Sequence, residues 1–420
     1  MNKECLASLY FDNARYDKIS KEHKGSLEWI WTHEEFQNWS TPDASRLLYI
    51  QGKPGSGKST LTKYFNDNLL EREPRAMSAI VAKFFYSYRE GEPQKSHYNM
   101  LRSILFDILN QNEAFFYHRF QIEHRRQVIL QNRGNGNFIA QHYELLKEVL
   151  LSLRDHSHAE RLYLIIDAVD ESEDDDRRAI LNLLFDLCSN TKYCVLKIFV
   201  ASRPLGLLDS QRSKFHSFIR MQDQTKSDIA NFATSLLKRL EFTSFLEQAT
   251  EYIVEHAQGV FLWVHLVEDE LLSLEEEGRP EEDIFEFLKS LPTELEDFYA
   301  NMLRKVGRKP TDVRDGIKMF QFVLFTYRPL TVSELLHALG IPDNLDREFT
   351  LSDESFQKRI PREQRIIHCG GNILEISQHH GTTTSYENSS TFELTKLQET
   401  EVFNLYIKHF ASSFFDPMDM

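Results

Sequence analysis

The chain has 420 residues, which is more than one ordinary hydrophobic core holds and enough for two or three domains. Hydrophobic residues make up 41% and charged residues 27%, a balance typical of globular proteins and not of disordered ones. The 49 basic and 64 acidic residues give a net charge of −15. A charge this negative argues against a protein that coats nucleic acid or binds an anionic membrane.

The cysteine content and the chain start favour a cytoplasmic protein. The four cysteines form no CxxC pair and no regular framework, as expected of reduced thiols and not of a disulfide scaffold or a zinc site. The first ten residues lack the basic start and apolar run of a secretory leader. No apolar stretch approaches the ~18 residues that a membrane-spanning helix needs.

The first half of the chain alternates apolar runs with segments of helical periodicity. Apolar runs predict strands at residues 47–50, 78–85, 161–166 and 196–201, with a weaker one at 215–220. Helical periodicity predicts helices from Lys58 onward, at 98–109 and at 138–153. Continuous apolar strands separated by helices predict a parallel sheet that is covered on both faces.

After about residue 225 the pattern becomes helical. Segments with helical periodicity lie at residues 227–240, 244–257, 260–274, 291–306 and 315–324. The acidic stretch 275–283 contains Gly278 and Pro280 and is predicted to be a loop, as is the polar stretch 381–390. Thr331 with Glu334 three residues later predicts a capping box at the start of another helix.

A glycine-rich motif follows the first predicted strand. Residues 52–59 match the pattern GxxxxGKS/T, in which backbone N–H groups surround a polyphosphate and the lysine reaches its β- and γ-phosphates. A chance match on a glycine-rich turn is the alternative, but a strand before the motif and a helix after it favour phosphate binding. Ser59 would also ligate Mg²⁺, and Thr60 would face the α-phosphate. The expected nucleotide-binding residues are Gly52, Lys53, Pro54, Gly55, Ser56, Gly57, Lys58, Ser59 and Thr60.

A second motif ends the predicted strand 161–166. Asp167 would lie at the carboxyl edge of the sheet, beside the phosphate loop, and would hold Mg²⁺, most often through water. Asp170 or Glu171 would orient and deprotonate the attacking water. The alternative for these two is an acidic surface turn, since further acids follow in the same stretch.

The next predicted strand ends in Ser202 and Arg203. An arginine at that edge can approach the γ-phosphate and respond to its hydrolysis. An ordinary loop arginine in contact with solvent is the alternative. We therefore name Asp170, Glu171 and Arg203 as the candidate catalytic residues.

Taken together, these motifs resemble the NACHT class of STAND P-loop ATPases, and most closely its fungal NLR-like group with a nephrocystin-like N-terminal NTPase domain. Ala168, directly after Asp167, and the pair Asp170-Glu171 are similar to the NACHT form of the Walker B motif. Further similar segments are residues 5–10, 19–23, 28–30, 84–86, 94–96, 101–109, 259–264, 291–295, 328–339 and 369–371. The resemblance covers about residues 5–377.

The resemblance implies an α/β P-loop NTPase with a parallel sheet flanked by helices, followed by an all-helical domain and a winged-helix-like region. The implied domains are a pre-P-loop helical segment at 1–40, the NTPase domain at 41–225, the helical domain at 226–305, and the winged-helix-like region with a divergent tail at 306–420. The usual N-terminal effector and C-terminal repeats are not recognised. The group's nucleotide-contacting histidine would correspond to His409, with Phe415 at matching spacing.

The resemblance also implies a function. Such proteins are signalling switches that bind ATP or ADP with Mg²⁺, hydrolyse slowly, self-associate and act on protein partners, here in fungal innate immunity or non-self recognition. Two alternatives stay open. One is an interaction scaffold that binds nucleotide without turnover; the other is a kinase or transferase, which would need an acceptor pocket.

Overall fold

The computed structural model describes residues 2–41, 43–88, 90–112, 138–155, 161–175, 177–189, 194–206, 208, 214–305, 309–326, 330–341, 357–370, 375–378 and 390–393. The chain forms two compact units, Met1–Lys289 and Ser290–Met420. The candidate site lies wholly in the first unit. The limits of the four domains expected from the sequence stay predictions.

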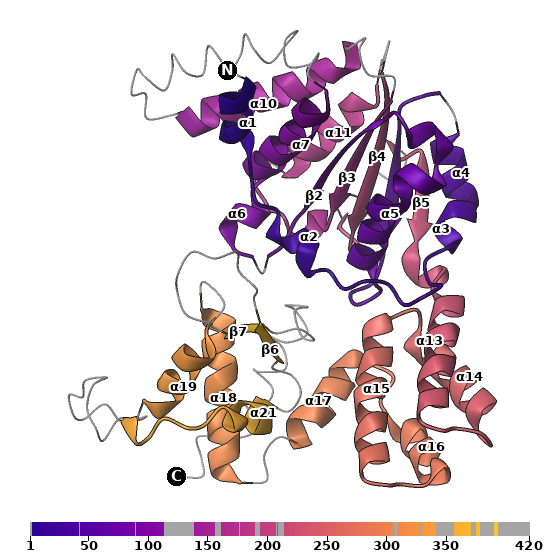
Figure 1. Ribbon diagram of the computed structural model, residues 1–420, viewed down its shortest axis with the longest axis vertical. Coiled ribbons are helices and arrows are strands. Elements are labelled where there is room, and N and C mark those ends of the chain that lie inside the picture. Colours follow the sequence, from indigo (N-terminus) through magenta and orange to yellow (C-terminus); the bar gives the residue numbers. More distant parts are fainter. Residues whose placement is uncertain are drawn as a thin grey trace. The chain divides into compact units, whose positions relative to one another are not determined.

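The first unit is built on a five-stranded parallel sheet (Figure 1). Its strands are β1 (Arg46–Gln51), β2 (Ile80–Phe85), β3 (Arg161–Asp167), β4 (Val195–Ser202) and β5 (Ser217–Arg220), in the order β2-β3-β4-β1-β5. All five predicted strands are confirmed, with ends shifted by one or two residues. Because β4 lies between β1 and β3, the carboxyl ends of these three strands meet at one edge.

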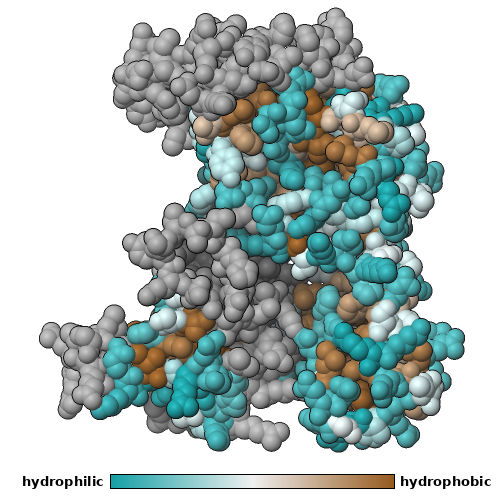
Figure 2. Space-filling view, viewed as in Figure 1, coloured by the Kyte–Doolittle hydropathy of each residue, from teal (hydrophilic) through white to brown (hydrophobic). Residues whose placement is uncertain are grey.

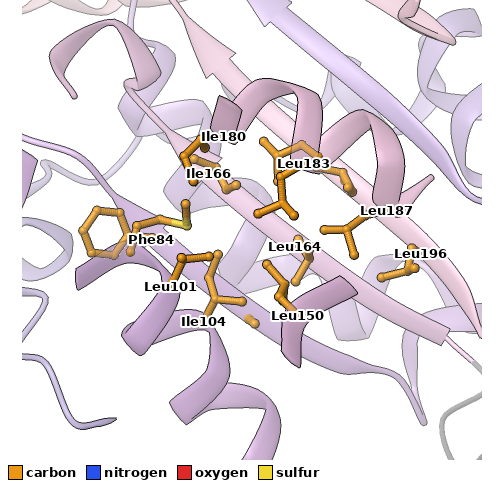
Figure 3. Packing of buried hydrophobic residues seen from close by; sticks show 14 of the residues in the cluster. Phe84, Leu101, Ile104, Leu150, Leu164, Ile166, Ile180, Leu183, Leu187 and Leu196 are labelled. Atoms are coloured by element: carbon orange, nitrogen blue, oxygen red, sulfur yellow. The ribbon is translucent and has the colours of Figure 1, made fainter. Parts of the chain in front are cut away.

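Alternate residues of the strands point into two separate cores. Leu162, Leu164 and Ile166 of β3 lie in one core, while Tyr163 and Ile165 lie in the other. The first core is completed by α7 (His97–Gln111), α10 (Phe138–Leu151) and α11 (Arg177–Leu187). Figure 3 shows how these helices contribute Leu101, Ile104, Leu150, Leu183 and Leu187. The prediction of a sheet covered on both faces is confirmed, although α11 is not among the predicted helices.

The second core is rich in aromatic side chains. It is completed by α3 (Trp29–Thr32), α4 (Glu34–Ser40) and α5 (Lys58–Arg72). The ring of Phe65 from α5 stacks on Phe199 of β4 with centroids 4.6 Å apart, and Trp39 of α4 is fully buried. This packing holds the helix that follows the glycine-rich loop firmly against the sheet.

Four helices follow the sheet: α13 (Lys226–Arg239), α14 (Leu246–Ala257), α15 (Phe261–Glu276) and α16 (Glu281–Ser290). The first three were predicted. The prediction of a loop over residues 275–283 is wrong at both ends, because only residues 277–280 join α15 to α16. The first turn of α16 holds Glu281, Glu282 and Asp283, and acidic side chains are favourable at a helix N-terminus.

Where the structure describes the second unit, it has helices and one antiparallel pair of strands. Its elements are α17 (Leu295–Lys305), α18 (Pro310–Phe325), α19 (Val332–Gly340), α21 (Gln364–Gly370), β6 (Glu375–Gln378) and β7 (Ser390–Glu393). The predicted capping box is confirmed: Glu334 N donates to Thr331 Oγ1 at 3.2 Å, and Thr331 N donates to Glu334 Oε2 at 2.9 Å. Ser390, which was expected in a loop, begins β7, and residues 381–389 lie outside the described residues.

Hydrophilic residues cover most of the described surface that faces the viewer in Figure 2. Within the described residues, no helix is both long enough and apolar enough to cross a membrane.

Candidate nucleotide-binding site

The glycine-rich loop connects β1 to α5 and folds around the side chain of Lys58. The Lys58 ammonium donates to the carbonyl oxygens of Gly52 and Lys53, both at 2.9 Å. Gly52 N donates to the carbonyl oxygen of Ser202 at the end of β4, at 3.2 Å. The loop is thereby fixed to the sheet edge, with a positive charge held against its carbonyls. Residues 52–60 all lie in this loop and in the first turn of α5.

Asp167 ends β3 at the same edge. Its side chain is 1% exposed, and Oδ1 accepts a hydrogen bond from Thr62 Oγ1 of α5 at 3.0 Å. Among the described residues, Oδ2 has no hydrogen-bond partner. Burial raises the pKa of Asp167 to about 6, although the Ser59 hydroxyl, the Arg15 charge and the Thr62 hydroxyl oppose this shift.

This corner of the site suits a magnesium ion. Magnesium prefers hard oxygen ligands and keeps several of its own waters. A buried carboxylate with one unpartnered oxygen, next to the Ser59 hydroxyl, is a donor set of this kind. The residues present therefore fit the ion that the sequence predicted.

Ala168 redirects the chain directly after Asp167. It adopts a left-handed conformation, with φ +55° and ψ +47°, and it precedes the single 3-10 turn Val169–Glu171. A small side chain lowers the steric cost of this conformation, which is high for β-branched or bulky residues. The turn brings Asp170 and Glu171 back to the sheet edge beside β4.

The three candidate catalytic residues meet there. Asp170 Oδ1 accepts from Arg203 N at 2.9 Å, and its Oδ2 lies 3.2 Å from Arg203 Nε. Glu171 Oε1 lies 3.7 Å from Arg203 Nη2, and Oε2 accepts from Tyr88 N at 2.9 Å. The Asp170 side chain is 9% exposed and the Glu171 side chain 22%. Asp170 thus anchors Arg203 with both oxygens, while Glu171 is the more accessible acid.

The stretch from Met221 to the start of α15 contributes residues that sequence reasoning did not assign to the site. Lys53 N donates to Gln222 Oε1, and the Lys53 ammonium donates to Gln258 Oε1, both at 3.4 Å. Leu262 N at the start of α15 donates to the carbonyl oxygen of Gly55 at 3.0 Å. A β-carbon on Gly55, whose φ is +66°, would lie 2.5 Å from Leu262 Cβ. The only available signal was the segment 259–264, quoted above as a family landmark and without a role.

Gly259, just before α15, lies in a second close approach, against the backbone of Gln222. Its φ is +79°, and a β-carbon there would lie 2.4 Å from the backbone oxygen of Gln222. We expect Gly259→Ala to cost about 3 kcal/mol of unfolding free energy, since both the backbone conformation and the backbone contact resist it. Gly278→Ala is the matched control, because Gly278 has φ +73° but open space around it, and about 1 kcal/mol is expected. Equal costs in urea unfolding would contradict the contact argument.

A cavity of about 350 Å³ lies beside the loop. Its wall combines Gly57 and Thr60 with the segment before the loop and with α13 and α15. The lining residues are Ser20, Lys21, Glu22, His23, Ser26, Leu27, Gly57, Thr60, Met221, Phe232, Phe261 and His265. A concave wall that combines aromatic and apolar side chains with polar groups is typical of small-molecule sites.

Residues 25–203 match the family model of the nephrocystin 3 N-terminal domain. Over 358 residues, or 81% of this chain, the sequence is 25% identical to the vegetative incompatibility protein HET-E-1 of Podospora anserina. The two matches support a NACHT-like protein. The chain spans 25% of the length of that relative.

Two solved structures are also similar to this chain. The ADP form of the ORC2 protein of Aeropyrum pernix has a TM-score of 0.38 at 13% identity, covering 97% of this chain and 99% of the other. The Walker-type ATPase paby2304 of Pyrococcus abyssi has a TM-score of 0.39 at 14% identity, covering 94% and 99%. The predicted fold class, a P-loop α/β domain followed by helices, rests on the sheet and the loop described above.

Some sequence predictions lie outside the described residues. These are His409 with Phe415, the residues 328 and 329 of the winged-helix-like segment, and Gly371. Their roles stay predictions.

Proposed function

We propose that this NACHT-like chain is a nucleotide-dependent switch that binds ATP or ADP with Mg²⁺ and hydrolyses ATP slowly. One observation carries the proposal: a buried carboxylate with an unpartnered oxygen, Asp167, lies beside a glycine-rich loop folded around Lys58. A structural acid would be expected to have both oxygens satisfied at this depth. A carboxylate that binds a cation would have an oxygen without a hydrogen-bond partner when the cation is absent.

The binding roles follow from the geometry. Backbone N–H groups of residues 52–57 and the Lys58 ammonium would hold the β- and γ-phosphates, and Thr60 would face the α-phosphate. Ser59 and Asp167 would hold Mg²⁺, which when bound neutralises phosphate charge and orients the terminal phosphate. The cavity beside Gly57 and Thr60 would take the base and the ribose.

For hydrolysis, Glu171 is the better base. Asp170 uses both oxygens to hold Arg203, so it acts as a positioning residue. Glu171 would take a proton from the attacking water while the water oxygen bonds to the γ-phosphorus. The bond between that phosphorus and the oxygen that bridges it to ADP would break, and ADP would leave with that oxygen. Arg203 would move from Glu171 toward the terminal phosphate, where its charge stabilises the transition state.

The helical segment would report the nucleotide. The hydrogen bond from Leu262 N to the Gly55 carbonyl links the phosphate loop directly to α15. A change of loop conformation between the ATP and ADP states would therefore alter the position of α15. Self-association, protein signalling partners, a cytoplasmic location and a role in fungal non-self recognition are proposed from the similarity to the vegetative incompatibility protein.

A second candidate function is a scaffold that binds nucleotide without turnover. The contacts of Glu171 favour it, because this acid is held by both Arg203 and the Tyr88 backbone N–H. An acid held in this way is less free to reach a water molecule.

The identity of the nucleotide that co-purifies with the full chain tests the proposal. Acid extraction and chromatography of the purified protein are expected to give about one ADP or ATP per chain. Protein that is isolated without nucleotide and also fails to bind added ATP with Mg²⁺ would contradict the assignment of the site.

Replacement of Glu171 separates the switch from the scaffold. Glu171→Gln is expected to keep nucleotide affinity and to lower the single-turnover rate of ATP hydrolysis about 100-fold, trapping ATP, because the general base is lost. Asp170→Asn is the comparison: if this variant traps ATP and Glu171→Gln does not, Asp170 is the base. Equal, near-zero rates for the wild type and both variants would favour the scaffold.

A further inference from the structure

The short helix α2 (Ala14–Lys18) lies next to the end of β2, at the sheet edge where Asp167 also lies. Phe85, the last residue of β2, pairs with Asp167 in the sheet register. The ring of Tyr16 contacts the ring of Phe85 with centroids 5.1 Å apart. On the other side of Arg15, Asn13 Oδ1 accepts from Gln94 Nε2, which also donates to the Phe85 carbonyl, both at 2.7 Å. The chain is thus attached next to Phe85 on both sides of Arg15.

The helix after the phosphate loop holds α2 from the opposite side. Lys63 Nζ of α5 donates to the carbonyl oxygens of Tyr16 at 2.9 Å and of Ile19 at 3.2 Å. Asn66 Nδ2 of α5 donates to Tyr16 Oη at 2.7 Å. Arg15 therefore belongs to a segment fixed in the corner between the end of β2 and α5, which is the corner where Asp167 accepts its hydrogen bond from Thr62.

Of the two basic residues of α2, Arg15 is the one whose charge acts on Asp167 in this corner. Lys18, the other basic residue of the helix, forms an ion pair with Glu90 at 2.8 Å. Arg15 is half-buried and, within the described part of the chain, has no hydrogen bond and no ion pair. Its charge is close enough to Asp167 to lower the pKa of that carboxyl group. A half-buried guanidinium without a partner beside the candidate magnesium ligand suggests that its partner is a ligand.

We propose that Arg15 binds the γ-phosphate of ATP and makes the site distinguish ATP from ADP. The proposal rests on the proposed nucleotide function. Since β3 lies between β2 and β4, Arg15 on the β2 side and Arg203 at the end of β4 flank Asp167 from opposite sides. A terminal phosphate next to an ion on Asp167 would be reached by both guanidinium groups. The planar fork of arginine matches two phosphate oxygens at once.

The simpler role for Arg15 is to compensate the buried charge of Asp167 without touching nucleotide. The two roles differ in what they predict for ligands. A contact with the γ-phosphate is absent when ADP is bound, so its loss affects ATP alone. If Arg15 only compensates the charge of Asp167, its loss affects ATP and ADP alike, because both nucleotides would bind with Mg²⁺ held by Asp167.

The experiment compares the full-length wild type with Arg15→Ala, Arg15→Lys and the control Lys18→Ala. Affinities for the non-hydrolysable analogue AMP-PNP and for ADP are measured by calorimetry with Mg²⁺. Arg15→Ala is expected to weaken AMP-PNP binding about 10-fold or more and ADP binding less than about 3-fold. Arg15→Lys is expected to lose less AMP-PNP affinity, since it keeps the charge but not the fork. Lys18→Ala is expected to change neither.

Equal loss of affinity for both nucleotides in the Arg15 variants, or no loss for either, would overturn the role of Arg15. Such a result would leave the proposed function intact as long as the wild type binds both ligands. A wild type that binds neither would contradict the proposed function itself. Circular dichroism and thermal melts of each variant show whether it is folded, and Arg15→Lys serves if Arg15→Ala is not.

Discussion

Lys58→Ala is expected to lower the affinity for ATP with Mg²⁺ by about 100-fold or more. The loop encloses the Lys58 ammonium, which lies 2.9 Å from the carbonyl oxygens of Gly52 and Lys53. When nucleotide binds, the ammonium would donate to phosphate oxygens in place of these carbonyls. Two charge-assisted hydrogen bonds contribute about 3 kcal/mol or more together, which corresponds to roughly two orders of magnitude in affinity. Backbone N–H groups alone cannot balance the charge of a triphosphate.

The control for this variant is Lys53→Ala. Among the described residues, the Lys53 ammonium donates to Gln258 Oε1 alone, at 3.4 Å, and its backbone N–H is kept in the variant. Its removal is expected to change the affinity less than about 3-fold. Calorimetry with ATP and Mg²⁺ on both folded variants checks the difference. Undiminished binding in Lys58→Ala would rule out the phosphate-loop assignment.

Asp167→Asn is expected to have opposite effects on stability and on ligand binding. Burial raises the pKa of Asp167 in the folded protein from the ordinary value of 3.8 to about 6, so the folded protein binds this proton more tightly than the unfolded chain does. The free energy of unfolding therefore falls as the pH rises from about 4 to 6. Above pH 7 the total decrease reaches its maximum of about 3 kcal/mol. A neutral side chain avoids this cost.

We therefore expect the ligand-free Asp167→Asn variant to be more stable than wild type at pH 7.5, with a smaller difference at pH 5.0. We also expect Mg²⁺ to stop enhancing its ATP affinity, because the carboxylate ligand is gone. Urea unfolding at both pH values and calorimetry with and without Mg²⁺ check the two parts. Asp170→Asn is the contrast: Asp170 is paired with Arg203, so its neutralisation is expected to destabilise. An Asp167→Asn variant less stable than wild type at both pH values would contradict the pKa argument.

Local patterns predicted much of the fold and part of the candidate site. The strand before Gly52, the helix from Lys58 and the capping box at Thr331 depend on neighbours in the sequence, which periodicity and residue type report directly. Helix α11 carries a similar signal in Ile180, Leu184 and Leu187, but its acidic surroundings concealed it. The start of α16 was missed because acidic residues suit a helix N-terminus as well as a loop.

Contacts between distant segments could not be predicted in this way. That Arg203 meets Asp170 and Glu171 depends on β4 lying between β1 and β3, and no pattern within a strand encodes its place in the sheet. The contact of Leu262 with Gly55 joins segments more than 200 residues apart in the sequence. Arg15 lies in a polar stretch without a motif, so only the fold brings it to the sheet edge. The roles of all these residues stay predictions until nucleotide binding is measured.

The contact between Leu262 and Gly55 also limits which segment could be transferred between proteins by gene fusion or recombination. The segment that matches the family model ends at residue 203, before β5, Gln222 and the start of α15. A gene fusion or recombination event that moved only residues 25–203 would leave β1 as an exposed edge strand and the Gly55 carbonyl without its donor. A unit that keeps both contacts must therefore extend at least to the start of α15, well past the segment that matches the family model.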